Sequence, residues 1–285
     1  MSRIKIMADS PCDLPIEIAN EYGITIMPIK FTINNTTYRD KFDMDTDEFY
    51  KTLRETGEIP VTSQITPIEF EDYFRETAKD CDEIIAVILS GNASGTFQNA
   101  VLAKNIVEEE TNVKIHLVDS QSFTFCYGYS ALKAAQMVKE GKSSEEIIAK
   151  LNEILSKQKV YFGVETLDYL KKGGRIKTTT AVIGGILDIR PLLMIKDGLV
   201  SSIDKVKGEK KLFSRMVEYA CSAAEEIGEN VKFYVLGSDN PDKVDTLEKM
   251  LEEKGYKAED DKFYIGPIIG THAGPGAYGI MVTID

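Results

Sequence analysis

Apolar positions along the chain fall into two patterns, namely short runs and longer stretches with helical spacing. The short runs are rich in Val, Ile and aromatic residues and predict strands. They cover residues 4–8, 24–29, 31–33, 36–39, 84–89, 113–118, 160–164, 192–195, 199–202, 231–236, 262–265 and 278–284. Asn34-Asn35 separates two of these runs and predicts a hairpin, because asparagine tolerates the left-handed backbone of a tight turn.

The longer stretches predict helices between these strands. Helical spacing covers residues 67–78, 96–109, 125–139, 209–227 and 241–254. Two further helices are predicted from capping boxes, one that starts near Asp45 and one that starts near Ser143. Since strands and helices alternate, the chain is predicted to be an α/β protein with helices on both faces of a sheet.

The length indicates more than one domain. At roughly 150 residues per domain, the 285 residues of the chain predict two α/β domains. The charged stretch 151–159 is the weakest part of the pattern. The expected domains are therefore residues 1–157 and residues 158–285.

Composition and charge exclude some classes of function. The net charge is −12 and no basic patch is present, so nucleic acid is not expected as a partner. The four cysteines are too widely spaced for a zinc knuckle and the two histidines bring no carboxylate set, so no metal site is expected. We expect the cysteines to be reduced, mostly buried thiols in a cytoplasmic protein.

Residues 264–284 lack Asp, Glu, Lys and Arg and are long enough to span a bilayer. Five glycines, two prolines and His272 would make this segment a very poor spanning helix. We therefore interpret it as loop and strand, and expect no membrane span.

The first candidate binding motif follows the apolar run 84–89. A small, hydroxyl-rich loop, Ser90-Gly91-Asn92-Ala93-Ser94-Gly95-Thr96, leads from this strand into a helix. Ser94, Thr96 and the backbone N–H groups of the loop would lie at a helix N-terminus, where the helix dipole stabilises an anion. The alternative is an ordinary helix cap, because Ser and Thr are preferred cap residues.

Two more motifs carry polar residues at chain turns. Thr62 and Ser63 precede the helix start at Thr66 and have no capping role, so their hydroxyls could bind a ligand. Gly173-Gly174 predicts a helix C-cap from which Arg175 projects, with a purely structural turn as the alternative.

The fourth motif is the glycine-rich segment 266–276, whose backbone can approach a ligand closely. His272 stands in its middle and is hard to explain by packing alone. A serine hydrolase that uses Ser94 and His272 is a weaker alternative, because the GxSxG nucleophile elbow is missing.

Taken in order, these motifs resemble the DegV family, which includes the FakB-type fatty-acid-binding subunits of bacterial fatty acid kinase. The resemblance is carried by Asp9-Ser10-Pro11-Cys12-Asp13-Leu14-Pro15, Thr62-Ser63-Gln64, Ser94-Gly95-Thr96-Phe97-Gln98-Asn99-Ala100, Val118-Asp119-Ser120, Gly173-Gly174-Arg175-Ile176 and Thr271-His272-Ala273-Gly274-Pro275-Gly276. It spans nearly the whole chain, and the ordered set is more specific than any one motif.

This resemblance implies a two-domain α/β protein that binds one long-chain fatty acid in a cleft or tunnel between its domains. The hydroxyls of Thr62 and Ser94 and the imidazole of His272 would hold the carboxylate. The full set of residues expected at the carboxylate is Thr62, Ser63, Ser94, Gly95, Thr96, Thr271 and His272. Arg175 would serve the engagement with a separate fatty acid kinase subunit, which phosphorylates the bound carboxylate to an acyl phosphate. The chain would then be a binding subunit, not an enzyme, and would need no cofactor.

Elementary energetics agrees with this interpretation. Burial of roughly 14 methylenes would contribute up to about 11 kcal/mol, before the cost of immobilising the ligand. The affinity is therefore expected from the tail, while hydrogen bonds to the carboxylate fix its orientation. Residues 180–187 and 192–194 could line the tunnel, with an ordinary core as the alternative. A small hydrolase or acyltransferase and a purely structural interaction module are the second and third hypotheses.

Overall fold

A computed structural model describes residues 2–176 and 188–285 of the chain. Their contacts form two compact units, each made of two chain segments. The first unit comprises Met1–Asp45 and Pro60–Ser156, and the second comprises Thr46–Ile59 and Lys157–Asp285. The expected domains were continuous, residues 1–157 and 158–285, whereas in this division residues 46–59 and Lys157 belong to the second unit.

A parallel sheet of four strands forms the centre of the first unit, in the order β2-β1-β6-β7. Its strands are β1 (Ile4–Asp9), β2 (Ile24–Met27), β6 (Glu83–Ile88) and β7 (Lys114–Asp119). β6 lies inside the sheet and is buried at every position after Glu83. This burial is what a continuous apolar run in a parallel sheet requires, since helices cover both of its faces.

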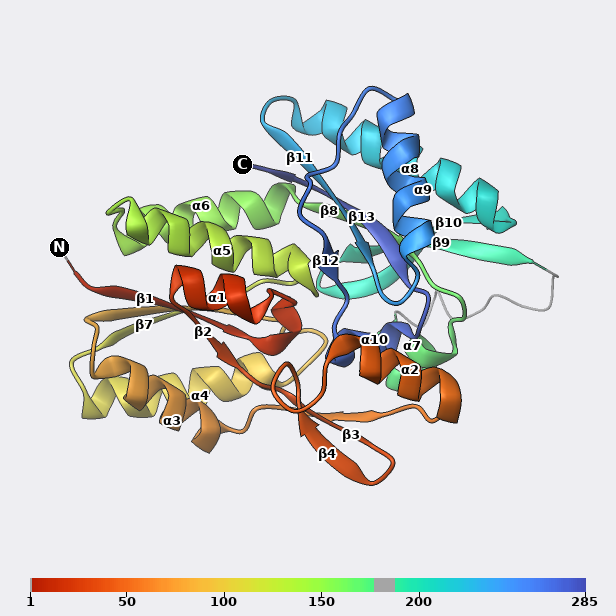
Figure 1. Cartoon of the computed structure of the whole chain (residues 1–285). Helices are drawn as coiled ribbons and strands as arrows, with labels where there is room; N and C mark the ends of the chain where they lie inside the picture. Colours follow the sequence, from red (N-terminus) through yellow and green to blue (C-terminus); the bar gives the residue numbers. More distant parts are fainter. Residues whose placement is uncertain (1, 177–187) are drawn as a thin grey trace. The chain divides into compact units, whose positions relative to one another are not determined.

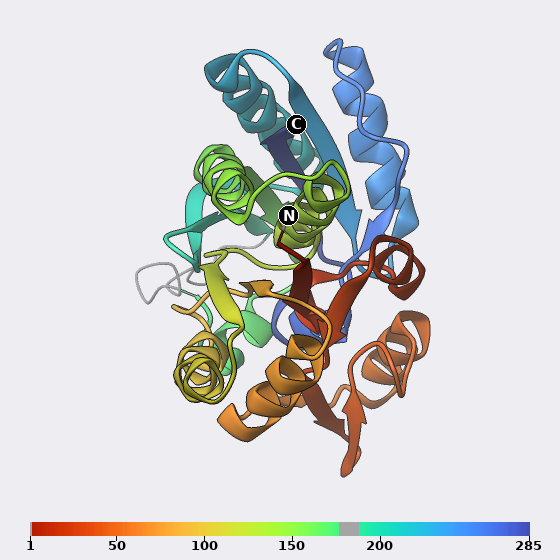
Figure 2. The ribbon, with the colours of Figure 1, turned by 90° about the vertical axis from the view of Figure 1, so that its left-hand side faces the viewer.

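The helices of the first unit are η1 (Ser10–Cys12), α1 (Ile16–Tyr22), α3 (Pro67–Ala78), α4 (Thr96–Glu110), α5 (Phe125–Lys139) and α6 (Ser144–Lys157). Figure 1 shows α1 and α5 on one face of this sheet and α3 and α4 on the other. Figure 2 shows α3 and α4 packed side by side, in orange and yellow. The predicted α/β fold with helices on both faces is confirmed for this sheet.

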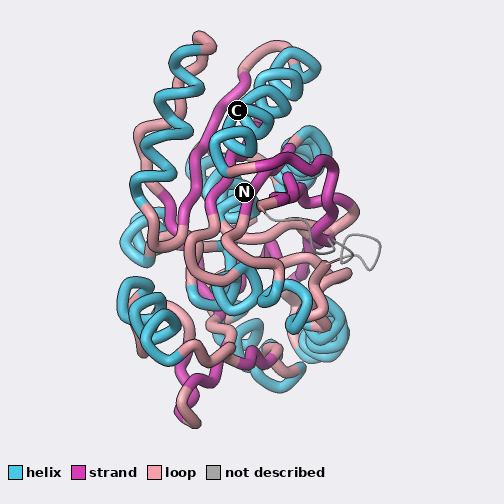
Figure 3. Tube along the Cα trace, turned by 90° about the vertical axis from the view of Figure 1, so that its right-hand side faces the viewer, coloured by secondary structure: helices cyan, strands magenta, loops and turns pink. Residues whose placement is uncertain are grey.

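A small antiparallel sheet completes the first unit. It contains β3 (Lys30–Ile33), β4 (Thr36–Arg39) and β5 (Val61–Ser63), in the order β4-β3-β5. Asn34 and Asn35 connect the first two strands with φ values of 50° and 60°, so the predicted hairpin is confirmed. This hairpin is the lowest part of the tube in Figure 3.

The second unit is built on a mixed sheet of six strands, in the order β10-β9-β8-β13-β11-β12. The strands are β8 (Lys159–Gly163), β9 (Ile189–Lys196), β10 (Leu199–Lys207), β11 (Val231–Gly237), β12 (Phe263–Tyr264) and β13 (Tyr278–Ile284). α8 (Glu209–Ile227) and α9 (Pro241–Glu253) pack on this sheet and on each other. Their contact buries a core that includes Leu192, Leu212 and Ile280.

Three shorter helices of the second unit are α2 (Thr46–Thr56), α7 (Asp168–Gly173) and α10 (Pro267–Ala273). The interpretation of residues 264–284 as loop and strand alone is wrong, because α10 lies within them. The helix forms where Gly270 lets the rings of Phe49 and Tyr50 approach its backbone, and an added Cβ there would lie 2.9 Å from the Phe49 ring. Tertiary packing thus outweighs the low helix propensity of a glycine-containing segment.

The structure also bears on the predicted state of the cysteines, on the predicted absence of a membrane span and on the residues named for the tunnel wall. Cys12, Cys81 and Cys126 are buried free thiols, as predicted, and Cys221 is partly exposed. Within residues 2–176 and 188–285, no helix is long and apolar enough to cross a bilayer. Residues 180–187, named as a possible tunnel wall, lie outside the described residues, whereas Leu192 belongs to the core of the second unit.

Candidate ligand-binding site

The first group of predicted site residues lies at the N-terminus of α4, where the sequence placed it. Gly95 is the N-cap residue and Thr96 is the first residue of the helix. The hydroxyl oxygens of Ser94 and Thr96 are 2.9 Å apart, and Ser94 Oγ also accepts a hydrogen bond of 3.2 Å from the Thr96 N–H. The two hydroxyls therefore form one linked pair at the helix end.

The electrostatics of this helix end favour an anion. The first turn of α4 contains no acidic residue, so no side chain there neutralises the positive end of the helix dipole. The loop before it is held in place by the carbonyl of Ser90, which accepts hydrogen bonds of 3.1 Å from both the Ala93 and the Ser94 N–H groups. Asp119 Oδ1 accepts a further bond of 3.0 Å from the Gly91 N–H. The position of the hydroxyl pair is thus fixed by the ends of two strands.

The strand that carries Thr62 and Ser63 is tied to this loop through Gln64. Asn99 on α4 donates from Nδ2 to Gln64 Oε1 at 3.3 Å and to the Ile65 carbonyl at 2.9 Å. The Gln64 amide lies directly on Gly95, where an added Cβ would be 2.7 Å from Gln64 Oε1. The structure therefore joins two predicted motifs, and it adds Gln64 and Asn99, which the sequence reasoning did not assign.

The second group of predicted residues lies on α7 and α10 of the second unit. Gly174 is the C-cap of α7 with a φ of 71°, as the Gly-Gly pair predicted, and Arg175 follows it. An added Cβ on Gly173 would overlap with Nδ1 of His272. Arg175 donates a hydrogen bond from Nη1 to the Gly173 carbonyl. The structure thus brings together Gly173, Arg175 and His272, which lie far apart in the sequence.

The imidazole of His272 is held in its neutral form at neutral pH. Burial lowers the pKa of His272 to about 4, and the positive charge of Arg175 contributes in the same direction. A neutral imidazole carries one N–H donor and one acceptor nitrogen. Thr271, beside it on α10, is 2% exposed, and its hydroxyl donates to the Pro267 carbonyl at 2.9 Å.

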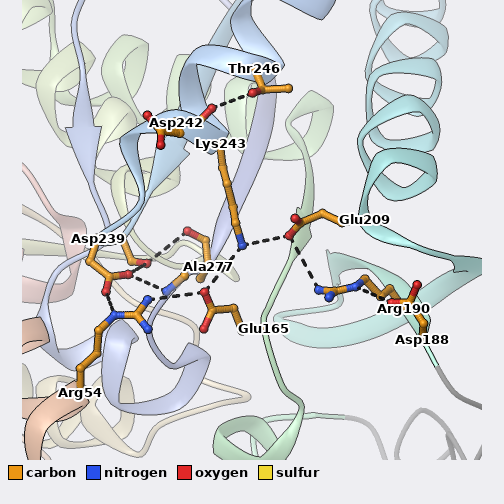
Figure 4. Close-up of polar contacts among 12 residues, drawn as sticks. Arg54, Glu165, Asp188, Arg190, Glu209, Asp239, Asp242, Lys243, Thr246 and Ala277 are labelled. Carbon is orange, nitrogen blue, oxygen red and sulfur yellow. Dashed lines mark hydrogen bonds and ion pairs between the residues drawn. The ribbon is translucent and has the colours of Figure 1, made fainter.

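A network of charged side chains surrounds the turn that follows α10 (Figure 4). Asp239 Oδ1 accepts a hydrogen bond of 2.6 Å from the Gly276 N–H, and the same carboxylate accepts one from Arg54 Nε on α2. Arg54 also reaches Glu165 at 3.5 Å, and Lys243 links Glu165 to Glu209. No motif pointed to these residues, since ion pairs between distant segments leave no pattern in a sequence.

Metal ligands were not expected, and the described part of the chain contains no group of three or more His, Cys, Asp or Glu side chains that could hold a metal ion. The predicted site residues themselves offer hydroxyls, backbone amides, an imidazole and a guanidinium.

Comparison with known proteins identifies the family. The profile of the family described as "Uncharacterised protein, DegV family" matches residues 3–285. The chain belongs to the DegV family. A DegV domain-containing protein of Caldanaerobacter subterraneus subsp. tengcongensis is 36% identical over 281 residues, which cover 99% of each chain.

Solved structures of two further proteins are similar to nearly the whole chain. A structure described as fatty acid binding of a DegV family protein from Thermus thermophilus matches with a TM-score of 0.90 and 31% identity, over 99% of this chain and 100% of that one. A stearic-acid-binding protein from Eubacterium ventriosum matches with a TM-score of 0.91 and 26% identity, over 99% of this chain and 98% of that one. The predicted DegV family and its α/β fold are thereby confirmed.

Proposed function

We propose that this chain binds one long-chain fatty acid and holds its carboxylate with hydroxyl, amide and imidazole donors. The observation that carries the proposal is the hydroxyl pair of Ser94 and Thr96, placed at a helix N-terminus without an acidic residue. Such a helix end attracts an anion even in a protein with a net charge of −12. The fatty acids named for the related DegV structures support a carboxylate as that anion.

Each candidate residue has a definite part in the proposal. Thr62, Ser63, Ser94 and Thr96 contribute hydroxyls and Gly95 a backbone N–H. His272 contributes one imidazole N–H, because its lowered pKa keeps the ring neutral at neutral pH. Thr271 donates its hydroxyl hydrogen to the Pro267 carbonyl, so it would donate to the carboxylate only by exchanging that hydrogen bond.

Most of the binding free energy would come from the acyl tail. Each buried methylene contributes about 0.8 kcal/mol, whereas one head-group hydrogen bond contributes about 0.5–1.5 kcal/mol net. Loss of one head-group donor should therefore weaken retention and disturb orientation without abolishing binding.

The decisive experiment is solvent extraction of the purified protein followed by mass spectrometry of the released lipid. We expect one equivalent of long-chain fatty acid per chain, and lower occupancy in Ser94→Ala and His272→Ala. Ser214→Ala, on α8, and His116→Ala, on β7, are matched controls outside both residue groups. Occupancy equal to that of the unchanged protein in both site variants would contradict the head-group assignment.

We further propose that the bound fatty acid is presented to a separate kinase subunit, with Arg175 acting in that engagement. The kinase would transfer the γ-phosphoryl group of ATP to the carboxylate, which yields an acyl phosphate and ADP. The positive charge of Arg175 lowers the pKa of His272, so this guanidinium lies near a residue that is proposed to bind the fatty-acid carboxylate. We expect Arg175→Ala to keep its fatty acid but to impair formation of the acyl phosphate with the kinase. Loss of the fatty acid itself would contradict this division of roles.

A hydrolase or acyltransferase that uses Ser94 is the second candidate function. It requires a base within reach of Ser94 Oγ, and the bonds that the structure gives this oxygen are to Thr96. A fluorophosphonate probe separates the two functions. Covalent labelling at Ser94 would favour the enzyme, whereas a binding protein stays unlabelled.

A further inference from the structure

Helix α2 holds both ends of the helix that carries His272. At the beginning of α10, Tyr50 donates a hydrogen bond of 2.9 Å from its hydroxyl to the carbonyl of Ile265. The rings of Phe49 and Tyr50 lie against Gly270 in the middle of that helix. Both rings are almost fully buried, with exposed fractions of 0% and 2%.

At the end of α10, the contact with α2 is made through charged side chains. Asp239 accepts a bond from the Gly276 N–H at 2.6 Å, and Ser238 Oγ donates to the same carboxylate at 3.0 Å. Glu165 packs on the other side of Gly276, because an added Cβ there would overlap with its carboxylate. The turn after α10 is therefore held between two carboxylates.

Arg54 of α2 is the side chain that contacts both of these carboxylates (Figure 4). The planar guanidinium can donate in two directions at once, which an ammonium group cannot do with the same geometry. Burial alone would raise the pKa of Asp239, but hydrogen bonds from Arg54, the Gly276 N–H and Ser238 hold it below its ordinary value. Arg54 thus keeps a half-buried carboxylate charged and fixed against the turn.

We propose that Arg54 is a positioning residue for His272, acting through Asp239 and Glu165 on the turn that ends α10. The inference rests on the proposed fatty-acid function of His272, and it adds a residue outside every motif that pointed to that function. Without Arg54, the two carboxylates around Gly276 repel each other, and among the described side chains Lys243 is the cation still paired with Glu165. The turn then loosens, and His272 loses its fixed place against Gly173.

The first readout needs no ligand. The chain contains two histidines, so the imidazole NMR spectrum of the delipidated protein contains one signal set from His272 and one from His116. In Arg54→Gln we expect the His272 signals to move and to titrate at a higher pH, as the ring becomes more exposed to water. The His116 signals, from the first unit, should stay unchanged.

The second readout is the affinity of the delipidated protein for palmitate. We expect Arg54→Gln to bind about five- to tenfold more weakly, and Arg54→Lys to recover part of the loss. In a background of Asp239→Asn, which keeps the oxygen that faces Gly276, removal of Arg54 should cost less affinity than it does alone.

Arg215→Gln is the matched control. Arg215 also lies on a helix of the second unit and also bridges two carboxylates, those of Asp204 and Glu218. This variant should leave both the His272 signals and palmitate binding unchanged. Unchanged His272 signals in Arg54→Gln, or an equal effect of Arg215→Gln, would overturn the inference.

The two proposals fail in different ways. If His272→Ala retains full affinity for palmitate, the proposed function of His272 is wrong, whatever the spectra of the Arg54 variants show. If His272→Ala weakens binding but Arg54→Gln moves neither readout, the head-group role stands and the positioning role is wrong.

Discussion

Gly173 and His272 occupy neighbouring space so tightly that a side chain at position 173 would overlap with the imidazole Nδ1. Gly173 is the last residue of α7, and its carbonyl accepts a hydrogen bond from Arg175. The imidazole of His272 can occupy its position because residue 173, on α7, has no side chain. Since atoms in protein interiors are close-packed, any added atom must displace the ring.

Gly173→Ala should therefore weaken fatty-acid retention while the protein still folds. We expect about tenfold weaker binding of palmitate, which corresponds to about 1.4 kcal/mol, from displacement of His272. Gly174→Ala is the matched control, because Gly174 has a φ of 71° but an added Cβ there would meet no atom within 4 Å. That control should lose about 1 kcal/mol of stability to backbone strain and keep its affinity. Equal affinities of Gly173→Ala and the unchanged protein would contradict the prediction.

The titration of His272 should contribute to stability in a defined pH range. Its pKa is lowered from 6.5 in the unfolded chain to about 4 in the folded one, first by burial and then by Arg175. Between pH 6.5 and about 4, His272 is protonated in the unfolded state but stays neutral in the folded state. The contribution of His272 to the free energy of unfolding should thus decrease as the pH falls from 6.5 to about 4, by up to about 3 kcal/mol. The difference in the free energy of unfolding between the unchanged protein and His272→Gln, measured by urea unfolding at each pH, should decrease by this amount over the same range.

Asp9, at the end of β1, should act in the opposite direction. Its carboxylate is fully buried and accepts bonds from the Leu89 N–H at 3.0 Å and the Tyr127 hydroxyl at 2.9 Å. Burial raises the pKa of Asp9 from 3.8 to about 7. Between these values the unfolded carboxyl is ionised and the folded one is protonated. The contribution of Asp9 to the free energy of unfolding should therefore decrease as the pH rises from about 4 to about 7, on the order of 4 kcal/mol.

Asp9→Asn tests this contribution, because the amide keeps an acceptor oxygen for Leu89 and Tyr127 but cannot ionise. The stability of this variant relative to the unchanged protein should increase steadily across the range from pH 4 to pH 7. Asp72→Asn, at an exposed position of α3, provides the control. A constant difference between Asp9→Asn and the unchanged protein across this range would show that Asp9 titrates normally.

The contact between Gly95 and Gln64 predicts that a second substitution, at Gln64, restores the stability lost by a substitution at Gly95. Gly95→Ala would place a Cβ 2.7 Å from Gln64 Oε1 and 2.8 Å from Nε2, so the amide must leave its place beside Asn99. We expect a loss of stability of about 1–3 kcal/mol and weaker palmitate binding, because the hydroxyl loop shifts. Adding Gln64→Ala removes the clash and should restore most of the stability. A double variant no more stable than Gly95→Ala alone would locate the strain elsewhere.

Local sequence signals predicted most of the elements that surround the candidate site. Thr66 caps α3 with a complete capping box to Glu69, and Pro67 takes the first helical position. Ser143 and Glu146 form the second box through hydrogen bonds of 2.9 and 3.3 Å. Such signals act within a few residues, so the sequence alone contains all that is needed to recognise them.

Other features depend on contacts that no local pattern reveals. α10 is a helix because Phe49 and Tyr50 pack on Gly270, and those residues belong to a segment far away in the chain. For the same reason, the transfer of residues 46–59 to the second unit could not be predicted from chain order. The ion pair of Arg54 and Asp239 could not be predicted, because ion pairs between distant segments carry no periodic or spacing signal.

Residues 46–59, which belong to the second unit but lie between two segments of the first, also affect folding during synthesis. α2 is synthesised early, on the order of two hundred residues before α10, its packing partner, and translation proceeds at about 5–20 residues per second. During that interval Phe49 and Tyr50, which end up almost fully buried, have no partner helix to cover them. Until α10 is made, the apolar face of the amphipathic helix α2, with Phe49, Tyr50 and Leu53, therefore lacks this partner. The contact between α2 and α10 thus joins an early part of the chain to a late one, and it is one of the last contacts that can form during synthesis.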